Sequence, residues 1–399
     1  MENFLKRTWA EIDLDALRHN YTVIRNAVKR DTEICWVVKA DGYGHGAVVV
    51  ARTLEEMGAA WFAVSNIEEA EQLRSGGVIG SILILGYTPP AMAQTLAERS
   101  ISQAVFSLDY AKELSDSAKA AGVTVKIHLK VDTGMSRIGF LYQVPERDGA
   151  NIDEMEAACR MAGLEPEGIF THFAVSDDGV PGDGYTQTQF DSFLSAIDEL
   201  GRRGITFRYR HSANSGAICD HPETHLDMVR PGIIIYGLLS DAIRNKLPLR
   251  PVMELKTVIS MLKTVEADTT VSYGRQFCTK GKTRLATVPI GYADGYPRKL
   301  FDRAVMLVNG RRVPLAGRVC MDQIVLDVTG VPDVETGMTV TVFGREGEEM
   351  LSVDELAKWN ETINYEMVCI VGKRVPRIFL QNGRVVGSLN YICPTDSVR

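Results

Sequence analysis

The sequence lacks paired cysteines and long apolar runs, and each absence excludes a class of protein. Its 7 cysteines are scattered singly, with no Cys-x-x-Cys pair, which is typical of reduced thiols rather than of a disulfide framework. No apolar stretch reaches membrane-spanning length, and the N-terminal segment MENFLKRTWAEIDLD has no signal-peptide core. We therefore expect a cytoplasmic protein that does not contact a membrane.

The distribution of charge and histidine excludes two further kinds of partner. The 44 basic and 51 acidic side chains give a net charge of −7 without a basic tract, so nucleic acid is not expected as a partner. The 7 histidines show no ligand spacing on one helix, so a bound metal is not indicated. The 399 residues, 45% hydrophobic and 24% charged, are enough for two globular domains.

Short β-type runs alternate with helical patterns through the first 240 residues. Eight such runs occur: EICWVVKA, WFAVS, SILILG, SQAVFS, TVKIHLKVD, EGIFTHFA, FRYRHSAN and MVRPGIIIYGL. Between them lie helix-like stretches, such as residues 13–30, where apolar residues recur at helical spacing from Leu14 to Val28. Alternating strands and helices predict parallel strands, and eight units predict a TIM-type (β/α)8 barrel over residues 1–245. A doubly wound open sheet is the alternative.

The pattern becomes β-rich beyond residue 245. Turn residues separate the runs, and Asn309-Gly310 is a strong signal for a hairpin. One helical stretch, SVDELAKWN, begins with a candidate N-cap at Ser352. We predict a second, mostly β domain over residues 246–399.

Polar residues stand where the predicted barrel strands end. The C-terminal ends of all strands in such a barrel meet on one face, where active sites are built. Any one of these residues alone is best explained as a hydrogen-bonded surface group, but their shared position predicts one site. They are Lys39, Lys130, Asp132, Arg137, His172, His211, Asn214, Ser215, Arg230, Gly232 and Ile233.

Lys39 suggests the chemistry of this site. A lysine amine at the edge of an apolar pocket loses its proton more readily, because desolvation disfavours the charge, and it can then form a Schiff base with an aldehyde. Pyridoxal 5′-phosphate suits such a pocket, and its phosphate could lie against Ser215-Gly216 and Gly232-Ile233. The Gly42-x-Gly44-x-x-Ala47 pattern fits a relaxed dinucleotide fingerprint, but no acidic residue ends the next run, AVSN. A nicotinamide cofactor is therefore disfavoured.

The motif VVKADGYGHG resembles the pyridoxal-phosphate attachment motif of the alanine racemases. The similarity continues in order through KVDTGMSRIG, THFA, HSANSG, RPGIIIYG, VSYGR, IGYADGYPR, GRVCMDQ and INYEMVCIVGKRVPR. This family combines an N-terminal (β/α)8 barrel with a C-terminal β domain. It is homodimeric, and each active site takes residues from the partner's C-terminal domain.

The resemblance implies a role for each cofactor-binding residue. Lys39 would carry the Schiff base, and Arg230 would face the pyridine nitrogen. His172 would lie near the ring, with His211 and Asn214 in the network around it. The residues that would hold the phosphate are Tyr43, Ser215, Gly232, Ile233 and Tyr365.

The resemblance also implies how the substrate is held. Tyr273 would be the second catalytic base and would come from the partner subunit, next to Arg137 at the substrate carboxylate. Met321 and Asp322 would complete the substrate pocket from the partner. Lys130 could be carbamylated and would then brace Arg137.

Racemisation must remove a proton from one face of the α-carbon and return one to the other, which two bases on opposite faces can do. The cationic candidates to favour the phenolate of Tyr273 are Arg137 and His172. An aspartate facing the ring nitrogen would keep that nitrogen protonated. Arg230 is always charged and cannot accept a proton, so the ring is a weaker electron sink and transamination should be suppressed. We thus expect a racemase that interconverts L- and D-alanine for bacterial wall synthesis.

Three other functions remain open from the sequence. A racemase of broader range, acting on serine or larger amino acids, depends on a pocket size that the sequence does not show. A basic amino acid decarboxylase is disfavoured by VSYGR. A non-catalytic pyridoxal-phosphate binding protein is disfavoured by the second domain, and by Tyr273 above all.

Overall fold

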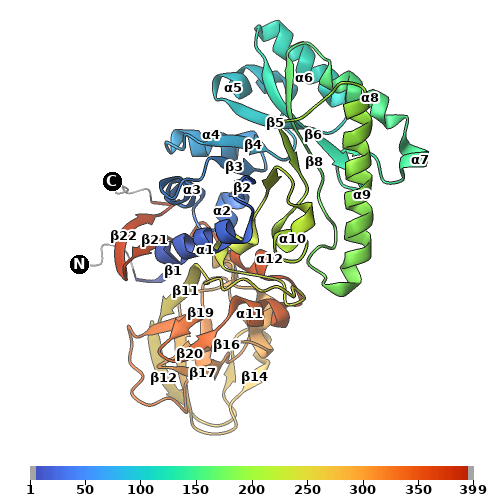
Figure 1. Ribbon diagram of the computed structural model, residues 1–399. Helices are drawn as coiled ribbons and strands as arrows, with labels where there is room; N and C mark the ends of the chain where they lie inside the picture. The colour runs from blue at the N-terminus through green and yellow to red at the C-terminus, as the bar shows by residue number, and fades with distance from the viewer. Residues whose placement is uncertain (1–5, 394–399) are drawn as a thin grey trace. The chain divides into compact units, whose positions relative to one another are not determined.

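The computed structural model describes residues 6–393 (Figure 1). By contacts, the chain forms two compact units, each made of non-consecutive segments. The barrel unit comprises Leu17–Gly42 and Ala47–Arg250, and the β unit comprises Met1–Ala16, Tyr43–Gly46 and Pro251–Arg399. The single domain boundary expected between residues 245 and 246 stays a prediction.

The barrel unit contains eight parallel strands, and each overlaps one of the eight β-type runs. The sheet order is β10-β2-β3-β4-β5-β6-β8-β9, and Asp227 N donates to Arg210 O at 3.1 Å where the last strand meets the first. The sheet is therefore a nearly closed barrel, which confirms the TIM-type fold over the doubly wound alternative. The strands are β2 (Glu33–Val37), β3 (Trp61–Val64), β4 (Ser81–Ile84), β5 (Ile101–Val105), β6 (Val125–Asp132), β8 (Leu164–Phe170), β9 (Tyr209–His211) and β10 (Met228–Val229), with β7 (Phe140–Leu141) beside β6.

Helices follow the strands and cover the outside of the barrel (Figure 1). They are α1 (Leu14–Ala27), α3 (Ala47–Glu56), α4 (Ile67–Ser75), α5 (Ala93–Glu98), α6 (Leu108–Ala121), α7 (Pro145–Asp148), α8 (Asn151–Cys159), α9 (Val180–Arg202) and α10 (Ser215–Asp220). Short 3-10 turns add η1 (Pro90–Met92), η2 (Pro222–Thr224) and η3 (Ile233–Tyr236).

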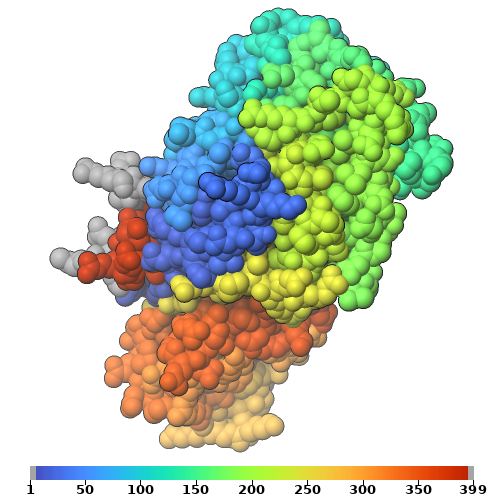
Figure 2. All heavy atoms as spheres, viewed as in Figure 1, coloured from blue at the N-terminus to red at the C-terminus, as the bar shows by residue number. Residues whose placement is uncertain are grey.

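The sequence of α9 explains its position on the barrel unit. Phe190, Phe193, Ala196 and Leu200 recur at helical spacing and are buried, so one stripe of the helix packs inward. The opposite side is polar and forms an exposed flank, drawn in green in Figure 2.

The β unit is built on a mixed sheet of order β17-β16-β19-β11-β1-β21-β22, with β20 beside β19. Its strands are β1 (Thr8–Asp13), β11 (Met253–Val258), β16 (Val305–Val308), β17 (Arg311–Pro314), β19 (Thr339–Glu346), β20 (Glu349–Leu351), β21 (Arg377–Gln381) and β22 (Arg384–Leu389). A second sheet pairs β12 (Met261–Val265), β15 (Thr283–Val288) and β18 (Ile324–Asp327), and a small one pairs β13 (Thr270–Val271) with β14 (Phe277–Cys278). The mostly β character expected of this region is confirmed.

Two local signals in the β unit act as the sequence predicted. Asn309 and Gly310 both have positive φ, 50° and 70°, as the two-residue hairpin between β16 and β17 requires. Ser352 caps α11 (Val353–Asn360) in a capping box with Glu355. The unit also contains α12 (Asn364–Cys369), η4 (Tyr273–Arg275), η5 (Tyr292–Asp294) and η6 (Arg298–Asp302).

The described residues lack both a membrane-spanning helix and a cluster of metal ligands. Within residues 6–393, no helix combines the length and apolarity that crossing a membrane requires. The same residues contain no group of three or more histidine, cysteine, aspartate or glutamate side chains placed to hold a metal ion.

Candidate functional site

Lys39 lies just after β2, at the start of an unusual left-handed turn, α2 (Lys39–Tyr43). Ala40, Asp41 and Gly42 all have positive φ, between 52° and 63°. Such a conformation costs roughly 1–2 kcal/mol for each residue other than glycine. The turn therefore needs support from its surroundings.

Hydrogen bonds from within the barrel unit supply that support. Gly42 N donates to Val38 O at 2.8 Å, and Ala40 N donates to Glu69 Oε1 at 2.7 Å. The other oxygen of Glu69 accepts from Ser65 N at 2.7 Å, so one carboxylate on α4 ties the turn to the end of β3. Sequence reasoning missed Glu69, because nothing distinguishes it from the neighbouring acidic residues of α4.

Arg230, just after β10, is a buried cation that forms no ion pair with a carboxylate of residues 6–393. Its side chain is 4% exposed. Nη1 donates to His211 Nδ1 at 2.8 Å, and Nη2 donates to Thr171 O at 2.7 Å and to Ser212 O at 3.0 Å. Burial lowers the pKa of Arg230 to about 10, which leaves the guanidinium charged at neutral pH. Within the described residues, Nε makes no hydrogen bond.

Lys130, near the end of β6, is buried with its amine uncommitted. Nζ has no hydrogen-bond partner within residues 6–393, and it lies 4.9 Å from the centre of the Phe170 ring. Burial, together with the positive charges of Arg230 and Arg137, holds the pKa of Lys130 well below its ordinary value, although Asp132 opposes this. These surroundings therefore favour the uncharged form of the amine.

The charges around His172 show which strand-end residues the barrel brings together. Burial lowers the pKa of His172 well below its usual value, and the charges of Arg230, Lys130, Arg137 and Lys39 lower it further. Five sequence-predicted residues, from four strands, thus lie within electrostatic reach of one another. The expectation that His172 supplies positive charge was wrong, because its ring is neutral.

Two helical turns begin next to each other after β9 and β10. Gly232 N, just before η3, donates to Ser215 Oγ at 2.9 Å at the start of α10. Asn214 caps α10 by accepting from Ala217 N at 3.1 Å. A Cβ on Gly216 would lie 2.7 Å from Ser176 O, so the close approach there requires glycine. The first N–H groups of both turns lack intrahelical acceptors and can bind an anion.

Tyr43 and Tyr365 are neighbours within the β unit. Their ring centroids are 6.2 Å apart, and Tyr43 is buried while Tyr365 is partly exposed. The backbone beside Tyr43 is held by Arg377, whose Nε donates to Gly44 O at 2.8 Å. This pair can present two phenol groups to one ligand.

The β unit gathers Tyr273, Met321 and Asp322 in one open hollow of about 450 Å³. Tyr273 is 67% exposed and Met321 is 51% exposed. Ser272, just before Tyr273, has a φ of 63° and a ψ of −177°, a region that residues other than glycine rarely adopt. Its Oγ donates to Arg318 O at 2.6 Å, which stabilises the strained turn and fixes the position from which Tyr273 projects.

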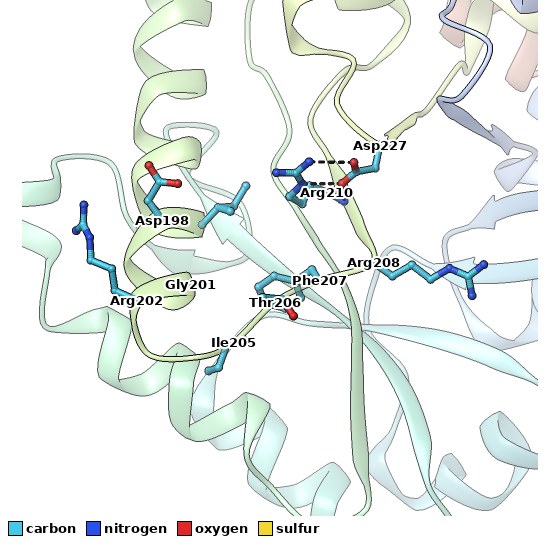
Figure 3. Close-up of a pocket in the computed structure, with 10 residues that line it drawn as sticks. Asp198, Gly201, Arg202, Ile205, Thr206, Phe207, Arg208, Arg210 and Asp227 are labelled. Atoms are coloured by element: carbon cyan, nitrogen blue, oxygen red, sulfur yellow. Dashed lines mark hydrogen bonds and ion pairs between the residues drawn. The ribbon is translucent and has the colours of Figure 1, made fainter.

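A second hollow, of about 550 Å³, lies in the barrel unit at the N-terminal end of β9, opposite the end that carries His211 and Asn214 (Figure 3). Its lining includes Arg208 and the ion pair of Arg210 with Asp227, whose Nε and Oδ2 are 2.6 Å apart. Arg208 and Asp227 directly precede β9 and β10, and Arg210 lies in β9, so this hollow is at the N-terminal ends of the two strands. That end of a barrel serves stability, so this hollow is not the candidate active site.

Two family models match most of the chain. The model described as alanine racemase, N-terminal domain, matches residues 12–240, and the model described as alanine racemase, C-terminal domain, matches residues 252–379. Among curated relatives, an alanine racemase of Desulfovibrio desulfuricans is 47% identical, and the match covers 96% of this chain and 100% of the relative.

Solved structures agree with these matches. An alanine racemase of Clostridium difficile 630 is 38% identical with a TM-score of 0.91, covering 98% of this chain and 100% of that one. An alanine racemase of Bacillus anthracis with bound L-Ala-P is also 38% identical, with a TM-score of 0.90, covering 98% of this chain and 99% of that one.

Proposed function

The chain belongs to the alanine racemase family, and from that premise we propose that it interconverts L-alanine and D-alanine with two bases, Lys39 and Tyr273. The observation that carries the proposal is the exposed phenol of Tyr273, held by a strained turn in an open hollow with Met321. A core tyrosine would be buried, and a non-catalytic relative of the barrel would not need this hollow.

The family depends on pyridoxal phosphate, and the residues present fit that group. Among the described residues, nothing accepts a hydrogen bond from Arg230 Nε–H and no carboxylate pairs with the guanidinium, which suits a ring nitrogen that stays unprotonated. When bound, the cofactor draws electrons from an amino acid's α-carbon and makes its proton removable. The residues that would hold it are Lys39, Tyr43, His172, His211, Asn214, Ser215, Arg230, Gly232, Ile233 and Tyr365.

The chain's own groups then divide the proton transfer between two faces of the substrate. Lys39 Nζ takes or returns the α-proton on one face, and Tyr273 Oη does so on the other. Arg137 binds the substrate carboxylate as a charged pair. Met321 and Asp322 line the pocket, and Arg374 Nη1 holds Asp322 Oδ1 at 2.8 Å.

We further propose that Lys130 is carbamylated. Its neutral amine attacks carbon dioxide, a new N–C bond forms, and one proton is released to water. The product carries a negative charge that pairs with Arg137. Supply of ¹³C-labelled carbon dioxide should give a carbamate NMR signal that disappears in Lys130→Gln. A signal that persists in the variant, or none in the wild type, contradicts the assignment.

The hollow around Tyr273 supports a homodimer with shared sites, because a base displayed this openly needs a second surface to complete a dry pocket. Within residues 6–393 none of the 7 cysteines forms a disulfide, which supports a cytoplasmic location. The D-alanine formed would supply peptidoglycan synthesis.

The reaction itself can be tested directly. The protein loaded with pyridoxal phosphate should abolish the optical rotation of L-alanine without releasing ammonia, pyruvate or carbon dioxide. Borohydride reduction should leave the cofactor attached to Lys39. Persistent rotation, or attachment at another lysine, contradicts the proposal. Chiral chromatography of a substrate panel separates an alanine racemase from one that prefers serine.

A further inference from the structure

A chain of four buried polar side chains leads from Arg230 into the interior of the barrel. Arg230 Nη1 lies 2.8 Å from His211 Nδ1, and His211 Nε2 lies 2.8 Å from His128 Nδ1. His128 Nε2 then lies 3.4 Å from Glu167 Oε1, which is an electrostatic contact outside hydrogen-bond geometry in this structure. Both histidines are 0% exposed, Arg230 is 4% exposed and Glu167 is 9% exposed. His128 and Glu167 stand in the middle of β6 and β8, below the strand ends that carry the site.

The chemistry of Arg230 at one end and Glu167 at the other fixes the direction in which protons are donated along these four side chains. A guanidinium only donates, so in the observed arrangement His211 Nδ1 accepts from Arg230 and carries no proton. The other tautomer would have to break this bond to Arg230. In a neutral ring the proton then resides on Nε2, which donates to His128 Nδ1. His128 in turn carries its proton on Nε2, facing the acceptor Glu167. Each donor in the chain therefore points away from Arg230 and towards the carboxylate.

Charge and burial agree with this direction. Burial holds the pKa of both His128 and His211 below the usual value, so both rings are neutral. Burial raises the pKa of Glu167, but the nearby His128 ring, the bond from Ser102 and the ammonium of Lys126, whose Nζ lies 3.4 Å from Glu167 Oε2, together lower it to about 2, so this group is anionic. A buried cation and a buried anion are thus joined through two neutral imidazoles.

The barrel provides space for this arrangement. A Cβ on Gly168, the partner of His128 in β8, would lie 2.3 Å from His128 Nδ1. The register between β6 and β8 also shifts between Ile127 and His128. The His128 ring stacks on Tyr209, with centroids 6.2 Å apart and planes 9° apart. The ring is therefore held on several sides and cannot turn freely.

We propose that His128 and Glu167 are positioning residues for the reaction: they hold His211 in the tautomer that accepts from Arg230, and so fix the orientation of the guanidinium towards the cofactor. Neither residue touches the substrate. The last step rests on the proposed function, whereas the His211 tautomer is a property of the barrel itself.

The test combines NMR of the imidazole nitrogens with steady-state kinetics of the holoenzyme. In protein labelled with ¹⁵N-histidine, His211 should show an unprotonated Nδ1 and a protonated Nε2. His128→Phe, which keeps a ring but removes the acceptor, should populate the other His211 tautomer and lower kcat about 10-fold, the scale of one lost hydrogen bond to a charged network. KM for alanine should change little. His128→Asn, whose Oδ1 can replace Nδ1 as acceptor, should restore both readouts.

Glu167→Gln keeps the size of the side chain and keeps the test available if His128→Phe fails to fold. It should weaken the tautomer preference and lower kcat in the same direction. Glu165→Gln is the matched control, because Glu165 lies two residues away on β8 and is exposed; it should change neither readout. A protonated His211 Nδ1 in the wild type, or an unchanged tautomer in folded His128→Phe and Glu167→Gln, overturns the proposal. A normal tautomer in a protein that does not racemise alanine would instead refute the proposed function alone.

Discussion

Replacing Gly168 by alanine should damage the barrel through one identifiable contact. The added Cβ would lie 2.3, 2.5 and 2.8 Å from three atoms of the His128 ring, all closer than real Cβ contacts allow. The φ of Gly168 lies outside the left-handed region, so an alanine there is not strained by its own backbone. The effect of the substitution is therefore purely steric.

The size of the effect follows from how little the ring can move. His128 packs against Trp61, with centroids 5.7 Å apart, as well as against Tyr209 and His211. Overpacking of a tight interior typically costs about 1–3 kcal/mol, and we expect Gly168→Ala to lie at the upper end of that range.

A double-mutant cycle isolates the contact. The free energy of unfolding would be measured in urea for Gly168→Ala, His128→Ala and the double variant at equal protein concentration. Without the His128 ring, the alanine at position 168 should cost almost nothing, which gives a coupling energy of about 3 kcal/mol. Gly201→Ala serves as the control, because a Cβ there meets nothing within 4 Å. Additive losses in the double variant would refute the steric explanation.

Three further predictions concern the site. Mixing Lys39→Ala with Tyr273→Phe subunits should recover up to about a quarter of normal activity, because about half of randomly exchanged dimers are mixed and each has one intact site; no recovery after proven exchange would place both bases on one chain. Arg230→Glu should retain the cofactor and gain transamination, measured as pyruvate formed from alanine, whereas a folded variant without pyruvate formation would contradict the role given to Arg230. Because the pKa of Glu167 is about 2 in the folded protein and about 4.3 in an unfolded chain, its ionised form contributes stability above about pH 4.3 that is lost as the pH falls towards 2. The urea stability of the wild type and Glu167→Gln should therefore converge over that pH range, and a constant difference would refute this linkage.

The sequence predicted which residues make up the candidate site better than it predicted their charge states and contacts. Lys39, Lys130, His172 and Arg230 were found because charged residues are conspicuous at the ends of apolar runs, and a barrel collects such ends on one face. Their electrostatic coupling around His172 agrees with that expectation. Which of them is neutral depends on burial, and burial exists only in the folded chain.

His128 stands out in the sequence as a polar residue within an apolar run, but the sequence does not show what the side chain contacts. It is a polar residue within the run TVKIHLKVD, at an alternating position that faces the barrel interior. The run predicts a strand whether or not a histidine is present. The link to His211, 83 residues away, arises only when β6 and β9 take their places in the barrel.

The sequence alone determined the elements whose signals are local. Eight apolar runs became eight strands, the Asn309-Gly310 turn closed a hairpin, and Ser352 capped a helix, because each depends on residues within a few positions. Only the tertiary structure decided that β1 pairs with β11 and β21, and that Arg230 connects through two imidazoles to Glu167. Strand partners and buried contacts are chosen by long-range packing, which residues far apart in the chain determine together.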